Sequence, residues 1–210
     1  MIPFTAEVLL RLYGSYSLAI WPVPLAGYAL GVLAVLLALR PLPGSGRAVA
    51  AILAAFWIWT GWVFHIEYFA DLNWGAWIFG ALFILQGLLL AWTGVIRGKL
   101  EFRFARDLRG WAGLTLVGLA LASPALGAVA GHGWPQMQLP GTLPAPTTVI
   151  TFGLLLMTGA RAALPLAVIP FLWALIGGAA AATLGLWEDF SLIFSAALTI
   201  FALIASKISR

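Results

Sequence analysis

The sequence has no cysteine and very little charge. Without cysteine the chain can form no disulfide, no thiolate-ligated zinc or iron–sulfur site and no thioether attachment of haem. Only 9% of the 210 residues are charged, whereas soluble domains carry about 25%. Because 63% of the residues are hydrophobic, the few charges cannot cover a water-soluble surface. The sequence therefore predicts an integral membrane protein with a single domain, residues 1–210.

Several apolar segments are long enough to cross a hydrocarbon core about 30 Å thick, which takes about 20 helical residues. We expect an all-α, polytopic helix bundle of seven spans, in which the fifth is short or broken because it is too short to cross unaided. A short interfacial helix within residues 1–12 should precede the first span, and Pro124 should kink the fourth. The expected spans are 17–39, 48–65, 75–96, 111–130, 147–160, 164–186 and 190–206.

Charges of opposite sign lie at opposite ends of these spans. Ten of the 11 basic residues fall in the tail and in the connections after spans 1, 3 and 5. The other side keeps Arg11 and five of the seven acids. By the positive-inside rule the basic side is cytoplasmic, which places the N-terminus outside and the C-terminus in the cytoplasm. The lipid bilayer already explains the basic charge, so we expect no nucleic-acid partner.

The two sets of three spans on either side of the fourth share weak similarity. Proline-containing segments, 21–24 and 143–146, open spans 1 and 5, and the same alignment pairs Gly31 with Gly153. Parallel triplet repeats joined by a linker span occur in sugar-facilitator folds. We therefore consider a 3+1+3 repeat, with chance matching of apolar helices as the alternative.

Histidines and acids gather at the predicted outer ends of the spans. His65 ends span 2 and His132 follows span 4. Imidazole and carboxylate groups suit divalent transition metals and proton transfer. The spacing is not a metal signature, since residues two apart, such as His65 and Glu67, do not share a helix face. A solvated acidic rim is the alternative, and the sequence identifies neither a metal nor a cofactor.

Segment 131–146 has four prolines and no formally charged residue. A connection this apolar is expected to fold onto the mouth of the bundle instead of extending into water. Thr147 and Thr148 follow it directly. A helix that starts there would point its positive dipole end at the outer mouth, toward an anionic or polar ligand. Ordinary helix capping and packing by these threonines is the alternative.

Five features of the chain form a recognisable pattern: Ile2-Pro3-Phe4-Thr5, Trp21-Pro22, His65 at the end of span 2, Pro146-Thr147-Thr148 and Phe152-Gly153-Leu154. The pattern resembles an uncharacterised family of bacterial inner-membrane proteins with a Pro-Thr-Thr motif, a domain of unknown function, over nearly the whole chain. The resemblance implies a multi-pass protein of the bacterial inner membrane and supplies no activity. A cysteine often precedes Pro-Thr-Thr in that family, whereas this chain has Ala145 and cannot use a thiol there.

Two functional hypotheses follow. The first is a small-solute or cation transporter or facilitator with an acidic, histidine-bearing mouth on the outer side. The second is an accessory or structural subunit of a larger respiratory or photosynthetic complex, with other membrane subunits as partners. We expect no enzymatic activity, because hydroxyls such as Ser123 have no histidine or acid at the same predicted depth. The expected ligand-binding residues are His65, Glu67, Asp71, His132, Thr147, Thr148, Glu188 and Asp189.

Overall fold

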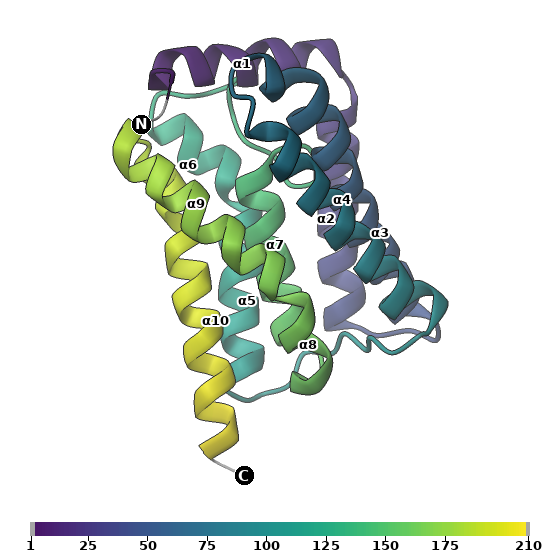
Figure 1. Cartoon of the computed structure of the whole chain (residues 1–210). Coiled ribbons are helices and arrows are strands. Elements are labelled where there is room, and N and C mark those ends of the chain that lie inside the picture. Colours follow the sequence, from purple (N-terminus) through teal and green to yellow (C-terminus); the bar gives the residue numbers. More distant parts are fainter. Residues whose placement is uncertain (1–2, 209–210) are drawn as a thin grey trace.

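The computed structural model describes residues 3–208, which form helices and no strand (Figure 1). Helices of ordinary α geometry make up most of the chain, while short π-helical and 3-10 segments extend three of them. The elements are α1 Ala6–Ala19, α2 Val23–Leu39, α3 Ser45–Trp59, η1 Thr60–Tyr68, η2 Phe69–Asp71, α4 Ala76–Leu90, η3 Ala91–Ile96, α5 Leu108–Leu121, α6 Ser123–Val129, α7 Pro144–Leu156, α8 Ala160–Leu166, α9 Val168–Leu184, η4 Trp187–Phe190 and α10 Ser191–Ile208.

Three helical segments are long and apolar enough to cross a membrane. They are Ser45–Asp71, Ala76–Ile96 and Trp187–Ser206, and the number rises to five if each of two bent helix pairs counts as one span. The bend between α5 and α6 is 53°, next to Pro124, which confirms the kink predicted there. The segments that follow α2, η3 and α7 lie at the same end of the bundle as the C-terminus (Figure 1).

The first apolar segment is broken where the sequence predicts a continuous span. Helix α1 meets α2 at 90° and lies across the upper end of the bundle in Figure 1. Pro22 and Pro24 explain the break, because proline lacks an N–H and its ring clashes with the carbonyl four residues earlier. The expected span 17–39 is therefore wrong at its start: residues up to Ala19 belong to α1, and the helix that enters the bundle begins at Val23.

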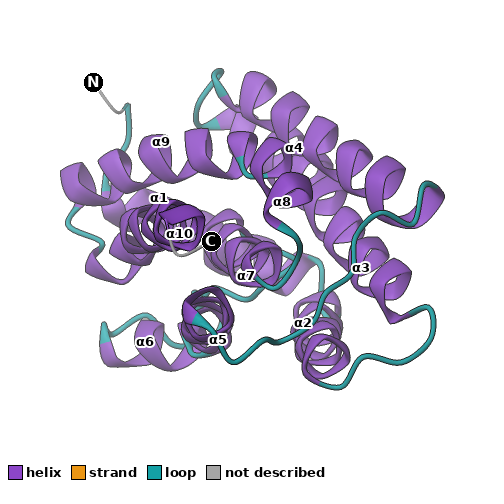
Figure 2. Ribbon diagram, turned by 90° about the horizontal axis from the view of Figure 1, so that it is seen from below, coloured by secondary structure: helices purple, strands orange, loops and turns teal. Residues whose placement is uncertain are grey.

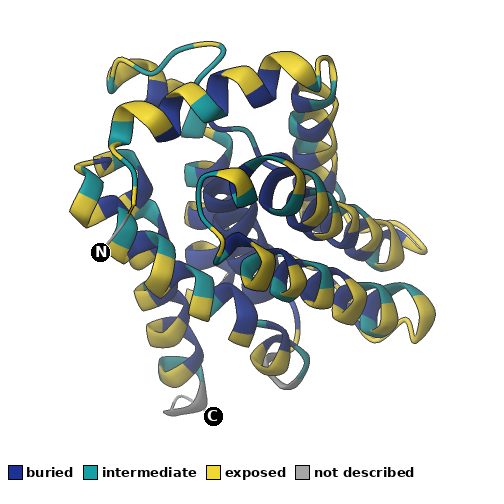
Figure 3. Ribbon diagram, turned by 45° about the horizontal axis from the view of Figure 1, so that its top comes forward, coloured by how far each residue is buried: buried dark blue, intermediate teal, exposed yellow. Residues whose placement is uncertain are grey.

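Helix α7 forms the centre of the molecule, and all of its residues are buried. Seen from below, it lies among α5, α9, α10 and α2 (Figure 2), and the buried residues concentrate in this interior (Figure 3). The fifth span expected at 147–160 is therefore misplaced, since the helix is Pro144–Leu156. Because other helices surround it, a helix of 13 residues here leaves no backbone group facing lipid.

The apolar connection between α6 and α7 folds onto the bundle, as its composition predicts. Gln138 and the run from Pro140 to Leu143 are buried. Gly141 has a φ of +87°, and a side chain at this position would begin 2.6 Å from the ring of Phe56. Glycine is therefore required here both by the left-handed backbone and by the close approach to α3.

Candidate functional site

A tight turn between α9 and α10 carries two acidic residues back into the bundle. Helix α9 ends at Leu184 and is capped by Gly185, whose φ of +75° is left-handed. The N–H of Leu186 bonds the carbonyl of Ala181 at 3.0 Å. The short helix η4 then places Glu188 and Asp189 against the connection between α6 and α7. Asp189 is only 9% exposed.

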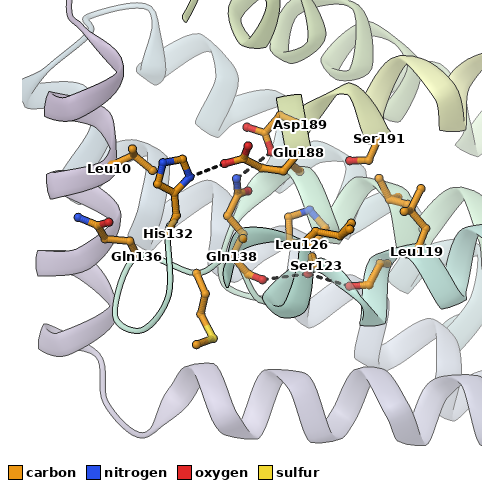
Figure 4. Close-up of a pocket in the computed structure, with 16 residues that line it drawn as sticks. Leu10, Leu119, Ser123, Leu126, His132, Gln136, Gln138, Glu188, Asp189 and Ser191 are labelled. Atoms are coloured by element: carbon orange, nitrogen blue, oxygen red, sulfur yellow. Dashed lines mark hydrogen bonds and ion pairs between the residues drawn. The ribbon is translucent and has the colours of Figure 1, made fainter. Parts of the chain in front are cut away.

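Both acids have partners in that connection, drawn in Figure 4. Nδ1 of His132 lies 2.7 Å from Oε1 of Glu188, with side-chain exposures of 23% and 8%. Nε2 of Gln138 donates to Oδ1 of Asp189, also at 2.7 Å. The hydroxyl of Ser123 bonds the Gln138 backbone carbonyl at 2.9 Å and so positions that residue. The charge-free connection thus supplies the polar groups that meet the acidic turn.

Two cavities adjoin Asp189. The smaller has a volume of about 20 Å³, enough for a single water molecule, and is bordered by His132, Gln138 and Glu188. Two of the residues that line it have a buried oxygen atom, Oε2 of Glu188 and Oε1 of Gln138, with no hydrogen-bond partner among the described residues. This hollow therefore has acceptor groups that a bound water or a ligand donor can satisfy.

The larger cavity has a volume of about 800 Å³ and is mainly apolar. Asp189 and Ala145 line both cavities, so these two residues separate a polar hollow from an apolar chamber. The walls of the larger cavity come from α1, the η1–η2 region, the start of α4 and most of α9. The aromatic and polar side chains that line this larger cavity are Phe4, Tyr13, Phe64, Phe69, Asn73, Trp74, Phe79, Trp173, Thr183 and Asp189.

His65 lies apart from His132 and the acidic turn, although both histidines occur toward the predicted outer ends. Its side chain is fully buried, and neither ring nitrogen has a hydrogen-bond partner among the described residues. Its nearest ring neighbours include Phe83 and Trp173, with centroids at 4.6 and 5.0 Å. The imidazole ring also contacts the rings of Phe64, Phe69 and Phe79, and Phe79 in turn contacts Trp173. These four aromatic residues line the larger cavity, so His65 lies behind the cavity wall.

The other predicted ligands are dispersed or engaged with backbone. Oε1 of Glu67 accepts from the indole of Trp62 at 2.7 Å, and exposed Asp71 lines a shallow groove with Arg11. The Thr147 hydroxyl accepts from the N–H of Gly141, and the Thr148 hydroxyl donates to the carbonyl of Pro144, both at 2.8 Å. Since α7 begins at Pro144, both threonines lie inside the helix and support its start.

Of the predicted residues, the structure brings together His132, Glu188 and Asp189. Among residues 3–208 no group of three or more histidine and acidic side chains is arranged to hold a metal ion. Sequence reasoning missed Gln138 and Tyr13. The amide of Gln138 was the one signal within reach, because a polar side chain in an apolar connection that folds onto the bundle needs a buried partner.

The chain matches one known family. Residues 6–210 fit the model of a family of unknown function, DUF6064, and the chain belongs to that family. This confirms the resemblance to a domain of unknown function over nearly the whole chain. No curated protein and no solved structure matches it.

Proposed function

We propose that this member of the family is a seven-span protein of the bacterial inner membrane that binds a small cationic solute at its outer end and passes it across the bilayer. The observation that carries the proposal is the place of Asp189, an acidic residue that lines both cavities. Its hydrogen-bond donor is the neutral amide of Gln138, and it forms no ion pair with a described residue.

The charges around Asp189 favour a cation. Glu188 and Asp189 are adjacent, and the basic group beside them is His132, which pairs with Glu188. With both carboxyl groups ionised, the three side chains carry two negative charges against at most one positive charge. An anion held away from water is costly unless an opposite charge accompanies it, so a positively charged solute is the complementary ligand.

The seven-span arrangement puts the cavities on the outer side. The three long segments, the bent pair of α5 and α6, and the helices α2, α7 and α9 would each cross once, which makes seven crossings. The basic connections would then share one side with the C-terminus. The end that carries α1, the η4 turn and segment 131–143 is then outside. A solute bound at Asp189 would enter from that side.

Flux measurements in proteoliposomes test the proposal. The purified protein would be reconstituted and assayed for uptake of Rb⁺, choline and benzyltrimethylammonium. We expect flux of at least one of these cations above that of protein-free liposomes. Asp189→Asn should reduce it by about thirtyfold or more, since losing one partner of a buried charge pair costs about 2 kcal/mol or more.

Glu7→Gln is the matched control for this experiment. Glu7 is an exposed acid of α1 at the same end of the bundle, and it lines neither cavity. Its neutralisation should leave flux unchanged. The proposal is wrong if all three cations cross no faster than through empty liposomes, or if the Asp189 and Glu7 variants transport equally well.

Purification of the protein for this experiment also distinguishes a transporter from the alternative, an accessory subunit of a larger membrane complex. A subunit would co-purify in fixed stoichiometry with other membrane proteins after mild solubilisation, and alone it would conduct none of the cations. A transporter would purify as copies of this chain only and would retain its flux.

A further inference from the structure

The cavity of about 800 Å³ is bordered by α4 and α9. Ile78 of α4 and Ile176 of α9 both line it, yet 56% and 42% of their surfaces are exposed. Helix α4 belongs to a segment long and apolar enough to cross a membrane, and α9 is an apolar helix of 17 residues. In a bilayer these exposed side chains meet lipid, so the wall between the cavity and the membrane is a single layer of apolar side chains through which we infer that a molecule dissolved in the membrane enters.

Aromatic rings form much of the cavity wall. Phe79 and Trp173 meet edge to face with centroids 5.5 Å apart, and Phe64 and Phe69 stack at 5.7 Å. Tyr13 joins them from α1. The face of an aromatic ring attracts a cation electrostatically, and more strongly where water is excluded.

Asp189 is the charged group among the described residues that line this aromatic chamber. Asp189 also lines the polar hollow, together with Gln138 and Glu188. The chamber therefore offers three features together, namely an apolar volume, ring faces and one carboxyl group. A volume of this size also falls in the range of about 300–1,000 Å³ that is usual for small-molecule sites.

We propose that this cavity binds an amphiphilic cation taken from the bilayer, with the positive centre at Asp189 and the apolar body against the rings. This inference rests on the proposed function and narrows its substrate class. A hydrophilic cation would leave the apolar walls uncovered, and a neutral lipid would leave the buried carboxylate without a counter-charge. A cation with aromatic or aliphatic substituents meets both requirements.

Binding of tetraphenylphosphonium to the full chain in lipid nanodiscs tests the inference. Equilibrium dialysis would measure it, with empty nanodiscs subtracted to remove partition into lipid. We expect saturable binding to the unaltered chain, weakened about tenfold or more by Asp189→Asn. Neutral triphenylphosphine oxide should show no such dependence on Asp189, because it has no charge for the carboxylate to balance.

Two alanines of α9, one inside the cavity and one outside it, provide a test substitution and its control. Ala180 is half-buried and lines the cavity, so Ala180→Phe should fill it and weaken binding by about tenfold or more. Ala182 is exposed and lines a shallow groove toward α10 instead. Ala182→Phe adds the same ring outside the cavity and should leave binding unchanged. Thermal unfolding of each variant shows whether it remains folded.

The results distinguish this inference from the proposed function. The inference is overturned if tetraphenylphosphonium shows no saturable binding, or if Asp189→Asn and Ala180→Phe both bind it as the unaltered chain does. In that case Asp189-dependent flux of Rb⁺ or choline would leave the proposed function standing. Conversely, Asp189-dependent binding without flux of any cation would support the site and reject transport.

Discussion

The indole N–H of Trp57 donates a hydrogen bond to the hydroxyl of Thr151 over 2.8 Å, and both side chains are fully buried. Trp57 belongs to α3 and Thr151 to α7, so the bond ties the central helix to its neighbour. The same hydroxyl donates to the carbonyl of Thr147 at 2.7 Å. Thr151 therefore uses both its donor and one acceptor position inside the protein.

Replacing Thr151 by valine tests what this bond contributes. Valine keeps the shape of threonine but leaves the Trp57 N–H buried without an acceptor, so Thr151→Val should lower the free energy of unfolding by about 1–3 kcal/mol. Thr115→Val is the control, because Thr115 makes the same backward bond within α5 on an exposed face. Reversible unfolding in mixed micelles measures both variants. Equal stability of the two would mean that the bond between α3 and α7 contributes nothing.

A second prediction concerns the close approach of α5 and α7. A side chain at Gly153 would begin 2.7 Å from Cγ1 of Val117 and 2.8 Å from the carbonyl oxygen of Gly113. Gly153→Ala should therefore destabilise the protein by about 1–3 kcal/mol through overpacking. Gly118, an exposed glycine of α5, has no atom within 4 Å of the same position. Gly118→Ala should raise the free energy of unfolding by about 0.5–1 kcal/mol. The same unfolding assay measures both variants, and the prediction is wrong if both substitutions stabilise the protein or both destabilise it.

Much of the helical layout follows from local chemistry. Proline accounts for the bend after α5, and the apolar composition of segment 131–146 accounts for its burial. The break between α1 and α2 does not follow from the two prolines alone, because Pro22 and Pro24 are compatible both with the start of a helix and with a sharp bend. The 3+1+3 repeat and the count of seven spans stay predictions.

The candidate site was harder to predict, because position along a span does not fix the direction of a side chain. His65 lies in η1, a π-helical segment, whose wider turn changes the direction in which each successive side chain points. An α-helical period therefore cannot place it, and its side chain is buried among rings. His132 and the η4 acids meet through the folding of a connection, which helix periodicity does not describe.

The burial of His65 leads to a third prediction. Both of its ring nitrogens lack a hydrogen-bond partner among the described residues, and aromatic rings surround it. Phenylalanine has a similar shape and no polar atom to satisfy. His65→Phe should therefore keep the free energy of unfolding unchanged or raise it by about 1 kcal/mol. Thermal unfolding of the purified protein measures this.

His132→Phe provides the contrast. It removes the partner of Glu188, whose side chain is 8% exposed, and should lower the free energy of unfolding by about 1–2 kcal/mol, with the partial exposure of His132 limiting the loss. If His65→Phe is instead the more damaging change, the imidazole of His65 must make a stabilising interaction with a bound molecule.

The last prediction concerns membrane topology, and the absence of cysteine makes it directly testable. A single cysteine introduced anywhere is the only thiol in the chain. Asp71 and Ala105 are both exposed, the first before α4 and the second before α5, so each substitution leaves the core untouched. With seven spans and the N-terminus outside, position 71 is outside and position 105 is cytoplasmic.

A membrane-impermeant maleimide applied to intact spheroplasts should therefore label Asp71→Cys and spare Ala105→Cys, and both should react once the membrane is permeabilised. The two positions flank the single segment Ala76–Ile96, which is long and apolar enough to cross on its own. Labelling of both before permeabilisation would mean that this segment does not span, whereas the reverse pattern would invert the topology. In the inverted case Asp189 and its cavities would face the cytoplasm, and the solute would have to enter from that side.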